Sequence, residues 1–161
     1  MVSDLQPYKY RVYKPDYFSF TTDNGAEYEC YFLSASEYFK DYPDISSNIF
    51  TFNLDLVSKP KTSRGVDKRI AHTVVTIVAA FLASQTNAVI YVCDTTDNRE
   101  KARFRKFKSW FDYFQGKDVQ QINASTEIEG IILYNAMLIH RKNKQRLRFI
   151  QAFLDLNDSE K

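Results

Sequence analysis

Cys93 and the two histidines are the residues of this chain with the most evident capacity for chemistry. Cys93 ends an apolar run just before Asp94, and ligands of open α/β sheets bind outside the carboxyl ends of such strands. A nucleophilic cysteine needs a basic partner, and the chain has only His72 and His140 to offer. The sequence places neither of them beside Cys93, so it favours a buried structural thiol.

A carboxylate on a predicted strand offers a second kind of chemistry. Asn53 and Asp55 alternate with Leu54 and Leu56, which predicts that the two polar side chains share one face of the strand. A carboxylate in that position could take a proton from an amine, as a general base does. Asp55 is therefore a candidate base, although the sequence shows no second group working with it.

Cations concentrated along one predicted helix are the clearest binding signal. They are Arg99, Lys101, Arg103, Arg105, Lys106 and Lys108. Five more cations flank the start of the last predicted helix, and adjoining basic patches would follow a phosphate backbone. Helical spacing also spreads the six over more than half of the helix surface, as in a solvated face that aids solubility. A surface for nucleic acid or an acidic protein and a solvated face both stay open.

Composition restricts the class of protein. The chain has 161 residues, of which 44% are hydrophobic and 26% charged; this is typical of one globular domain and excludes a disordered or collagen-like chain. Residues 1–58 hold 4 Lys/Arg and 9 Asp/Glu, whereas residues 59–161 hold 18 and 11. The two Cys and two His match no zinc motif, so no metal site is expected.

The most apolar segment is too short to cross a membrane. It runs from Ile70 to Leu82, well below the roughly 20 residues that a bilayer requires. The N-terminus has no apolar stretch after a basic start, unlike a secretory signal. We therefore expect a cytoplasmic protein with no membrane partner, folded as a single domain over residues 1–161.

The first 58 residues have the pattern of an antiparallel meander. A period of two predicts strands over residues 8–13, 17–22, 26–33 and 49–57. The Asn24-Gly25 pair predicts a tight primed turn in the hairpin between the second and third of these segments. Whether the first segment pairs within the main sheet is left open.

Helices and strands alternate in the rest of the chain. Asp67 is a candidate N-cap, and the predicted elements are a helix over 67–84, a strand over 88–93, a helix over 97–115, strands over 119–126 and 131–140, and a helix over 145–156. We expect the first helix to form a right-handed crossover between the strands on either side of it, with those two strands parallel. The expected fold is α/β with a mixed sheet: an antiparallel N-terminal meander followed by β-α-β-α-β-β-α.

This succession resembles the GNAT acetyltransferase superfamily over about residues 8–140. In that superfamily antiparallel strands lead into a helix whose N-terminus binds the pyrophosphate of acetyl-CoA, and free amide groups and the helix dipole favour such an anion. The resemblance implies a GNAT-like fold, an acyl-CoA or other phosphate-bearing ligand, and N-acyltransferase activity. It is a likeness of order and spacing, and topology alone does not determine function.

The resemblance assigns roles to individual residues. Arg64 matches the first position of the superfamily's phosphate loop, whereas Asp67 and Arg69 stand where glycine or alanine is usual. A carboxylate at Asp67 is electrostatically unfavourable for a bound pyrophosphate. The implied cofactor-binding residues are Arg64, Lys68, Arg69 and Asn98. Tyr113 would be the acid that protonates the departing thiolate, and Asp55 would be the base.

The whole chain also resembles a small, uncharacterised family of Bacteroidota proteins. The segments that carry this likeness are residues 18–31, 48–52, 67–74 and 91–111. It implies a bacterial source and no particular chemistry. A non-catalytic binding module and a homodimer formed through an edge strand of the meander remain alternatives to the acyl-CoA interpretation.

Overall fold

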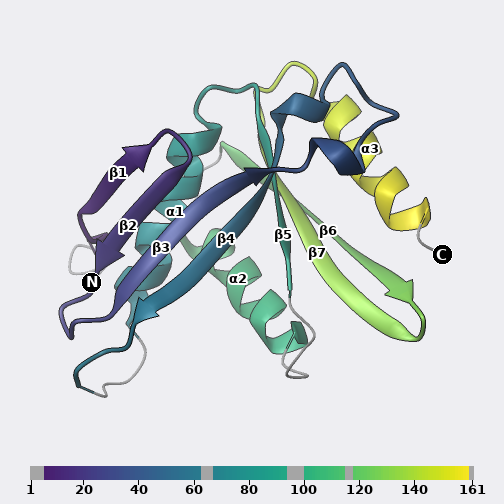
Figure 1. Cartoon of the computed structure of the whole chain (residues 1–161). Helices are drawn as coiled ribbons and strands as arrows, with labels where there is room; N and C mark the ends of the chain where they lie inside the picture. The colour runs from purple at the N-terminus through teal and green to yellow at the C-terminus, as the bar shows by residue number, and fades with distance from the viewer. Residues whose placement is uncertain (1–5, 63–66, 94–99, 115–117, 160–161) are drawn as a thin grey trace.

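Seven strands form one mixed sheet, and helices lie on both of its faces (Figure 1). The computed structural model of the protein describes residues 6–62, 67–93, 100–114 and 118–159. The elements are β1 (Tyr10–Lys14), β2 (Tyr17–Thr21), β3 (Glu27–Ser34), the 3-10 helices η2 (Ser36–Tyr38) and η3 (Ser46–Asn48), β4 (Ile49–Ser58), α1 (Lys68–Leu82), β5 (Ala88–Val92), α2 (Glu100–Phe114), β6 (Val119–Ile128), β7 (Ile131–His140) and α3 (Arg146–Ser159).

The strand order β1-β2-β3-β4-β5-β7-β6 confirms the expected mixed α/β sheet. β1 pairs with β2 at the edge, so the first strand does belong to the main sheet. β4 and β5, which α1 connects, are parallel, as a right-handed crossover predicts. The other pairings between the described strands are antiparallel.

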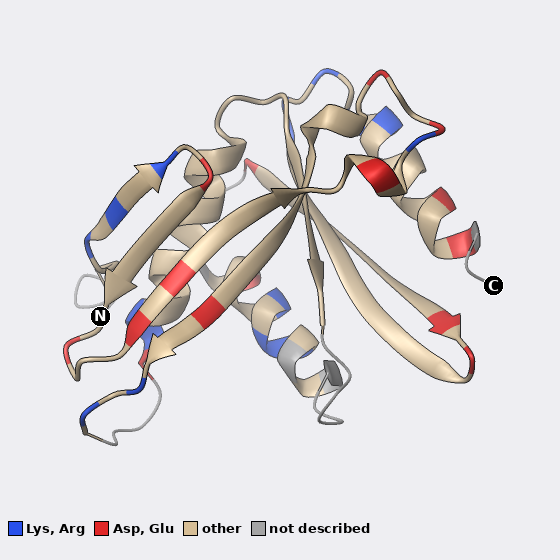
Figure 2. Ribbon diagram, viewed as in Figure 1, with Lys and Arg blue, Asp and Glu red and all other residues tan. Residues whose placement is uncertain are grey.

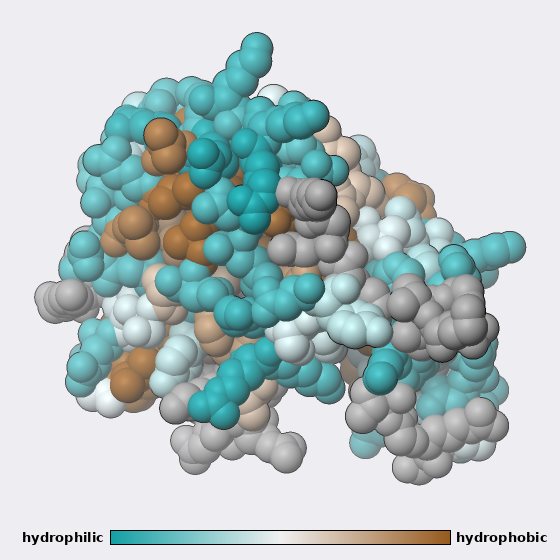
Figure 3. All heavy atoms as spheres, turned by 180° about the vertical axis from the view of Figure 1, so that it is seen from behind, coloured by the Kyte–Doolittle hydropathy of each residue, from teal (hydrophilic) through white to brown (hydrophobic). Residues whose placement is uncertain are grey.

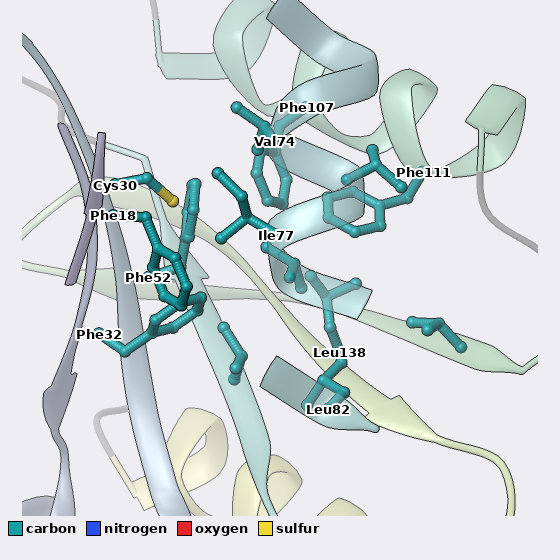
Figure 4. Close-up of a cluster of buried hydrophobic side chains, with 14 of the residues drawn as sticks. Phe18, Cys30, Phe32, Phe52, Val74, Ile77, Leu82, Phe107, Phe111 and Leu138 are labelled. Carbon is teal, nitrogen blue, oxygen red and sulfur yellow. The ribbon is translucent and has the colours of Figure 1, made fainter. Parts of the chain in front are cut away.

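One face of the sheet, the inner face, is covered by α1 and α2. Alternate residues of β2, β3 and β4 point into this layer, where Phe18, Phe32 and Phe52 are buried. Burial of one such side chain contributes roughly 1.5–3 kcal/mol. Figure 4 shows these side chains converging on those of the two helices, with the labelled residues Phe18, Cys30, Phe32, Phe52, Val74, Ile77, Leu82, Phe107, Phe111 and Leu138.

The opposite face, the outer face, is covered only over part of the sheet. α3 and the 3-10 segment pack on β5 and β7 there, through a cluster that includes Phe39, Ile90, Met137, Phe149 and Phe153. Ala88, Val89 and Ile90 of β5 are thus buried on both faces, as the continuous apolar run predicts, whereas Val92 at the end of the strand is 50% exposed. The two 3-10 helices were not among the predicted elements.

The two hairpin turns differ in geometry. In the β2–β3 turn Gly25 has a φ of 88° while Asn24 has no positive φ, so the predicted primed turn is wrong. Thr22 N instead donates to Ala26 O at 2.8 Å and closes a three-residue loop. The β6–β7 turn is the primed one, because both of its central residues, Glu129 and Gly130, have positive φ (51° and 84°).

α1 begins at the predicted cap. The Asp67 side chain accepts a hydrogen bond from Arg69 N at 2.9 Å, which satisfies one of the free donors of the first turn. Thr73 and Thr76 bond back to the carbonyl oxygens of Arg69 and His72. Within the described residues, no helix combines the length and the apolar character needed to cross a bilayer.

The sheet opens between β4 and β5. The two strands pair only where both begin, through Ile49–Ala88, Phe50–Val89 and Thr51–Ile90. Beyond Thr51 they diverge, and Figure 1 shows them spreading from a common point like the two sides of a V. This opening lies against the layer formed by α1 and α2, and it positions the site described next.

Candidate functional site: a groove beside the open seam

A groove of about 560 Å³ lies between the inner face and the two helices that cover it. Its floor includes Phe52 and Leu54 of β4 and Tyr91 of β5, the two strands that diverge. Residues from the first turn of α1 and from the second half of α2 form its walls. Seen from behind (Figure 3), the side on which α1 and α2 lie is mostly hydrophilic, with hydrophobic residues gathered in smaller patches.

Aromatic rings make the floor apolar. Tyr91 and Phe107 are stacked with ring centroids 3.7 Å apart, and Phe52 lies 5.4 Å from Phe107. Trp110 continues the aromatic surface along α2, with its ring 6.1 Å from that of Phe107. Such a surface buries apolar or flat parts of a ligand without needing to move.

Two lysines and one carboxylate supply the charge of the groove. Lys68 lies in the first turn of α1, and Lys106 lies on α2 with its ammonium 5.8 Å from the centre of the Trp110 ring. Asp67 is also a lining residue. The groove therefore combines an apolar floor with two cations near one anion.

Asp67 is held in place by bonds within the chain. Besides capping α1, its carboxylate accepts a hydrogen bond from the Tyr8 hydroxyl. Burial, and next this hydrogen bond, raise the pKa of Tyr8 above its ordinary value. The carboxylate thus occupies the helix start at which the resemblance to the GNAT superfamily predicts a pyrophosphate.

The predicted cofactor-binding residues are separated by the fold. Lys68 lines the groove. Arg69 turns toward the N-terminal segment instead: its guanidinium stacks 3.9 Å from the centre of the Tyr8 ring and pairs with Asp23 at 3.0 Å. Arg64 and Asn98 lie outside the described residues.

The predicted acid and base lie on opposite sides of the sheet. Tyr113 lines the groove. Asp55 is on the outer face, where it accepts a hydrogen bond from the Tyr31 hydroxyl at 2.9 Å. The fold therefore does not bring Tyr113 and Asp55 into one site.

The predicted basic patch is described only in part. Arg105 and Lys106 are exposed, and Figure 2 shows basic residues along α2. Lys108 pairs with Asp112 at 2.9 Å on the same helix. Arg99 and the side chains of Lys101 and Arg103 lie outside the described part of the chain. The cations of the last helix include two that are engaged, because Arg146 donates to Gln120 and Arg148 pairs with Asp44.

Neither cysteine has the setting of a reactive nucleophile. Cys93 is 1% exposed and Cys30 is fully buried. Burial raises the pKa of the Cys30 thiol well above its ordinary value, which disfavours the thiolate that a nucleophile requires.

Sequence analysis missed the aromatic lining of the groove. Phe107 and Trp110 recur at helical spacing in the predicted helix over 97–115, and Phe52 alternates with polar residues in the predicted strand over 49–57; both patterns favour core positions. Those assignments are correct as far as they go, since all three also contact the core. The missing information is the divergence of β4 and β5, which leaves part of this aromatic surface open.

Comparison with known proteins identifies a family model and nothing more specific. Residues 66–155, more than half of the chain, match a model described as a family of unknown function, DUF6169. The matched range extends from the start of α1 into α3. No curated protein and no solved structure gives a significant match.

Proposed function

The chain belongs to DUF6169, a family of unknown function, and we propose that its groove binds an acyl-CoA or a ligand of the same build. Such a ligand joins a phosphate-bearing group to a long, flexible arm that contains amides. The proposal concerns binding and does not include acyl transfer.

The divergence of β4 and β5 is the observation that carries this proposal. From Phe52 onward β4 has no described strand partner on the side of β5. Backbone N–H and C=O groups need partners, and an extended amide-containing arm supplies them as an added strand would. The floor of Phe52, Leu54 and Tyr91 lies at the same place.

The two lysines of the groove supply the attraction for phosphate. Lys68 and Lys106 come from different helices and line the same groove, so both attract an anionic group bound in it. The negative charge of Asp67 opposes this attraction, and its carboxylate accepts the hydrogen bond of the Arg69 backbone amide. Phosphate binding in this chain would therefore depend on lysine side chains more than on the helix start.

The position of Asp55 is the reason why transfer is left out. An acyltransferase needs a base that removes a proton from the acceptor amine. Asp55 lies across the sheet from the groove, and Asp67 is already bonded to Tyr8. A role for Tyr113 as an acid stays a prediction, as do the cytoplasmic location and the bacterial origin.

Thermal unfolding in the presence of coenzyme A, acetyl-CoA and ADP tests the proposal. A ligand at 100 times its dissociation constant adds about 2.7 kcal/mol to the free energy of unfolding, or roughly 5–10 °C in a domain of this size. We expect this shift with the two coenzyme A compounds and a smaller one with ADP, which lacks the arm. Equal shifts with all three ligands would show that the arm of coenzyme A does not bind between the diverging strands β4 and β5.

Charge reversals locate the binding site. Lys68→Glu and Lys106→Glu should each reduce the coenzyme A shift by more than half. Lys142→Glu is the matched control, because Lys142 is exposed and lies outside the groove. Equal behaviour of all three variants would contradict the proposal. A shift only with duplex DNA, falling steeply with salt and lost in Arg105→Glu, would support the nucleic-acid alternative instead.

A further inference from the structure

The outer face of β1–β4 is a sheet surface without a covering layer among the described residues. Among the described residues, α3 and the 3-10 helices cover this face over β5, β6, β7 and the start of β4. Figure 1 shows β2, β3 and β4 crossing the front of the molecule with no helix before them. Antiparallel sheets commonly expose one face to water, so exposure alone does not mark a binding site. The types of residue on this face indicate a binding site.

A row of tyrosines crosses three strands of the outer face. Tyr17 and Tyr31 are direct cross-strand partners with stacked rings 5.5 Å apart. Tyr13 meets Tyr17 edge-on at 6.0 Å and is 58% exposed. An ordinary solvated face carries long charged side chains, whereas this one presents a continuous aromatic row.

A pair of carboxylates lies beside this row. Glu29 of β3 and Asp55 of β4 are also direct cross-strand partners, which places two like charges opposite each other, an unfavourable arrangement. The Tyr17 and Tyr31 hydroxyls donate to Glu29 and Asp55, respectively. These bonds orient the carboxylates but do not neutralise them.

The strands that carry this pair, and β2 beside them, contain no cation. β2, β3 and β4 have no Lys or Arg, and Figure 2 shows acidic residues but no basic ones along β3 and β4. β1 contributes one cation, Arg11, which pairs with Ser19, the partner of Glu29, and so lies in the same row two strands away from Glu29. Hydrogen bonds with Ser19 and then with Arg11 lower the pKa of Tyr13. No ion pair to Glu29 or Asp55 is present within the described part of the chain.

We propose that this outer face of β1–β4 is a docking surface for a basic, arginine-containing segment of another protein. A guanidinium lies flat on a tyrosine ring and donates two parallel hydrogen bonds to a carboxylate. The tyrosine row and the carboxylate pair are adjacent on the same face, so arginines of one segment reach both. Neutralising Glu29 and Asp55 also removes their mutual repulsion.

A second copy of the chain fits this surface less well. In a two-fold dimer whose axis passes through the carboxylate pair, the same patch meets itself, and Glu29 and Asp55 face the carboxylates of the other copy. Like charges brought together across an interface cost several kcal/mol. Charge complementarity therefore selects a basic partner.

Fluorescence anisotropy with a labelled peptide of alternating Arg and Ser tests the proposal on the full chain. The variant Glu29→Gln with Asp55→Asn removes both charges and keeps an acceptor for each tyrosine hydroxyl. We expect it to weaken binding at least about tenfold. The matched control is Glu37→Gln with Glu127→Gln, which removes two exposed carboxylates from η2 and β6 and should change the affinity less than about twofold.

Two further measurements separate the explanations. Tyr13→Ser should weaken binding severalfold, and a peptide of alternating Lys and Ser should bind less tightly than the Arg peptide, because lysine does not stack and fork in the same way. Equal weakening in the test and control variants would show attraction to net charge alone and overturn the proposal. So would a dimer, seen in sedimentation, that the Glu29/Asp55 variant dissociates.

Discussion

The two faces of β1–β4 are formed by alternate residues of the same strands. On the inner face Phe18, Cys30 and Leu54 form one cross-strand row and pack under α1. One residue further along, Ser19, Glu29 and Asp55 form the corresponding row on the outer face. The first row is apolar and contributes to the core, while the second is polar and ends in two carboxylates.

The contrast teaches how one set of strands can serve two purposes. The side-chain period of two lets each face be specified independently, so stability and recognition do not compete for the same positions. β5 has no such freedom, because α1 and α2 on one side and α3 on the other bury it on both faces. A recognition surface on this sheet is therefore confined to the half that α3 does not reach.

Neighbouring residues of β3 give the largest expected difference between the two faces. Phe32 is 1% exposed and stacks on Phe81 at 3.9 Å, so Phe32→Ala should lower the free energy of unfolding by about 3–5 kcal/mol. Tyr31→Ala, on the outer face, should lower it by about 1 kcal/mol. Urea unfolding measures both, and losses of similar size would contradict the division of the faces.

The layer beneath α3 should show an intermediate effect. Asn157 exchanges hydrogen bonds with buried Asn135 at 2.8 and 3.1 Å. Asn157→Ala leaves the Asn135 side chain without this partner, so we expect a loss of about 1–3 kcal/mol in the free energy of unfolding. Gln151→Ala, on the exposed side of the same helix, is the control and should change it by less than about 0.5 kcal/mol.

The charge of Asp67 sets apart the groove of the inner face from the acidic outer face. Asp67→Asn keeps an N-cap and removes the carboxylate beside Lys68. If the groove binds coenzyme A, its affinity should rise about threefold to tenfold, equivalent to roughly 1 kcal/mol, in a calorimetric titration. Asp118→Asn, exposed and outside the groove, should leave the affinity unchanged; an unchanged Asp67→Asn variant would separate this carboxylate from the site.

Titration of Tyr17 is the smallest effect and the sharpest test of the outer face. The hydrogen bond to Glu29 raises the pKa of Tyr17 to about 12. A pKa raised on folding stabilises the protein below the ordinary value near 10, and this contribution is lost as the pH rises through about 12. Phenolate absorbance should show Tyr17 titrating near 10 in Glu29→Gln. Asp55→Asn, which acts mainly on Tyr31, should leave most of the Tyr17 shift in place.

Local patterns were enough to predict most elements of this fold. The strand from Ile131 to His140 was predicted with its observed bounds, and Asp67 caps α1 as expected, because alternation and capping depend on neighbouring residues. The prediction of a primed turn between β2 and β3 was wrong because Asn24-Gly25 is compatible with more than one loop length. The alternation of residues along β4 also indicated that the side chain of Asp55 points to the opposite face from that of Phe52.

The candidate site was predictable only in pieces. Lys68 and Tyr113 do line the groove, yet the groove exists because β4 and β5 separate after Thr51. That separation depends on how α1 and α2 pack between strands far apart in the sequence. No periodicity within β4 or β5 records it, so the sequence does not reveal the opening beside Trp110.

The short contact between β4 and β5 also bears on the order in which the molecule assembles. β6–β7 pairs through ten residue pairs across a two-residue turn, whereas β4–β5 pairs through three. Hairpins form within microseconds, but the β4–β5 ladder must wait for a long loop containing α1 to close. We therefore expect the two parts of the sheet to join late in folding, and amide hydrogens at Phe50 and Thr51 should exchange with solvent before those of Leu138.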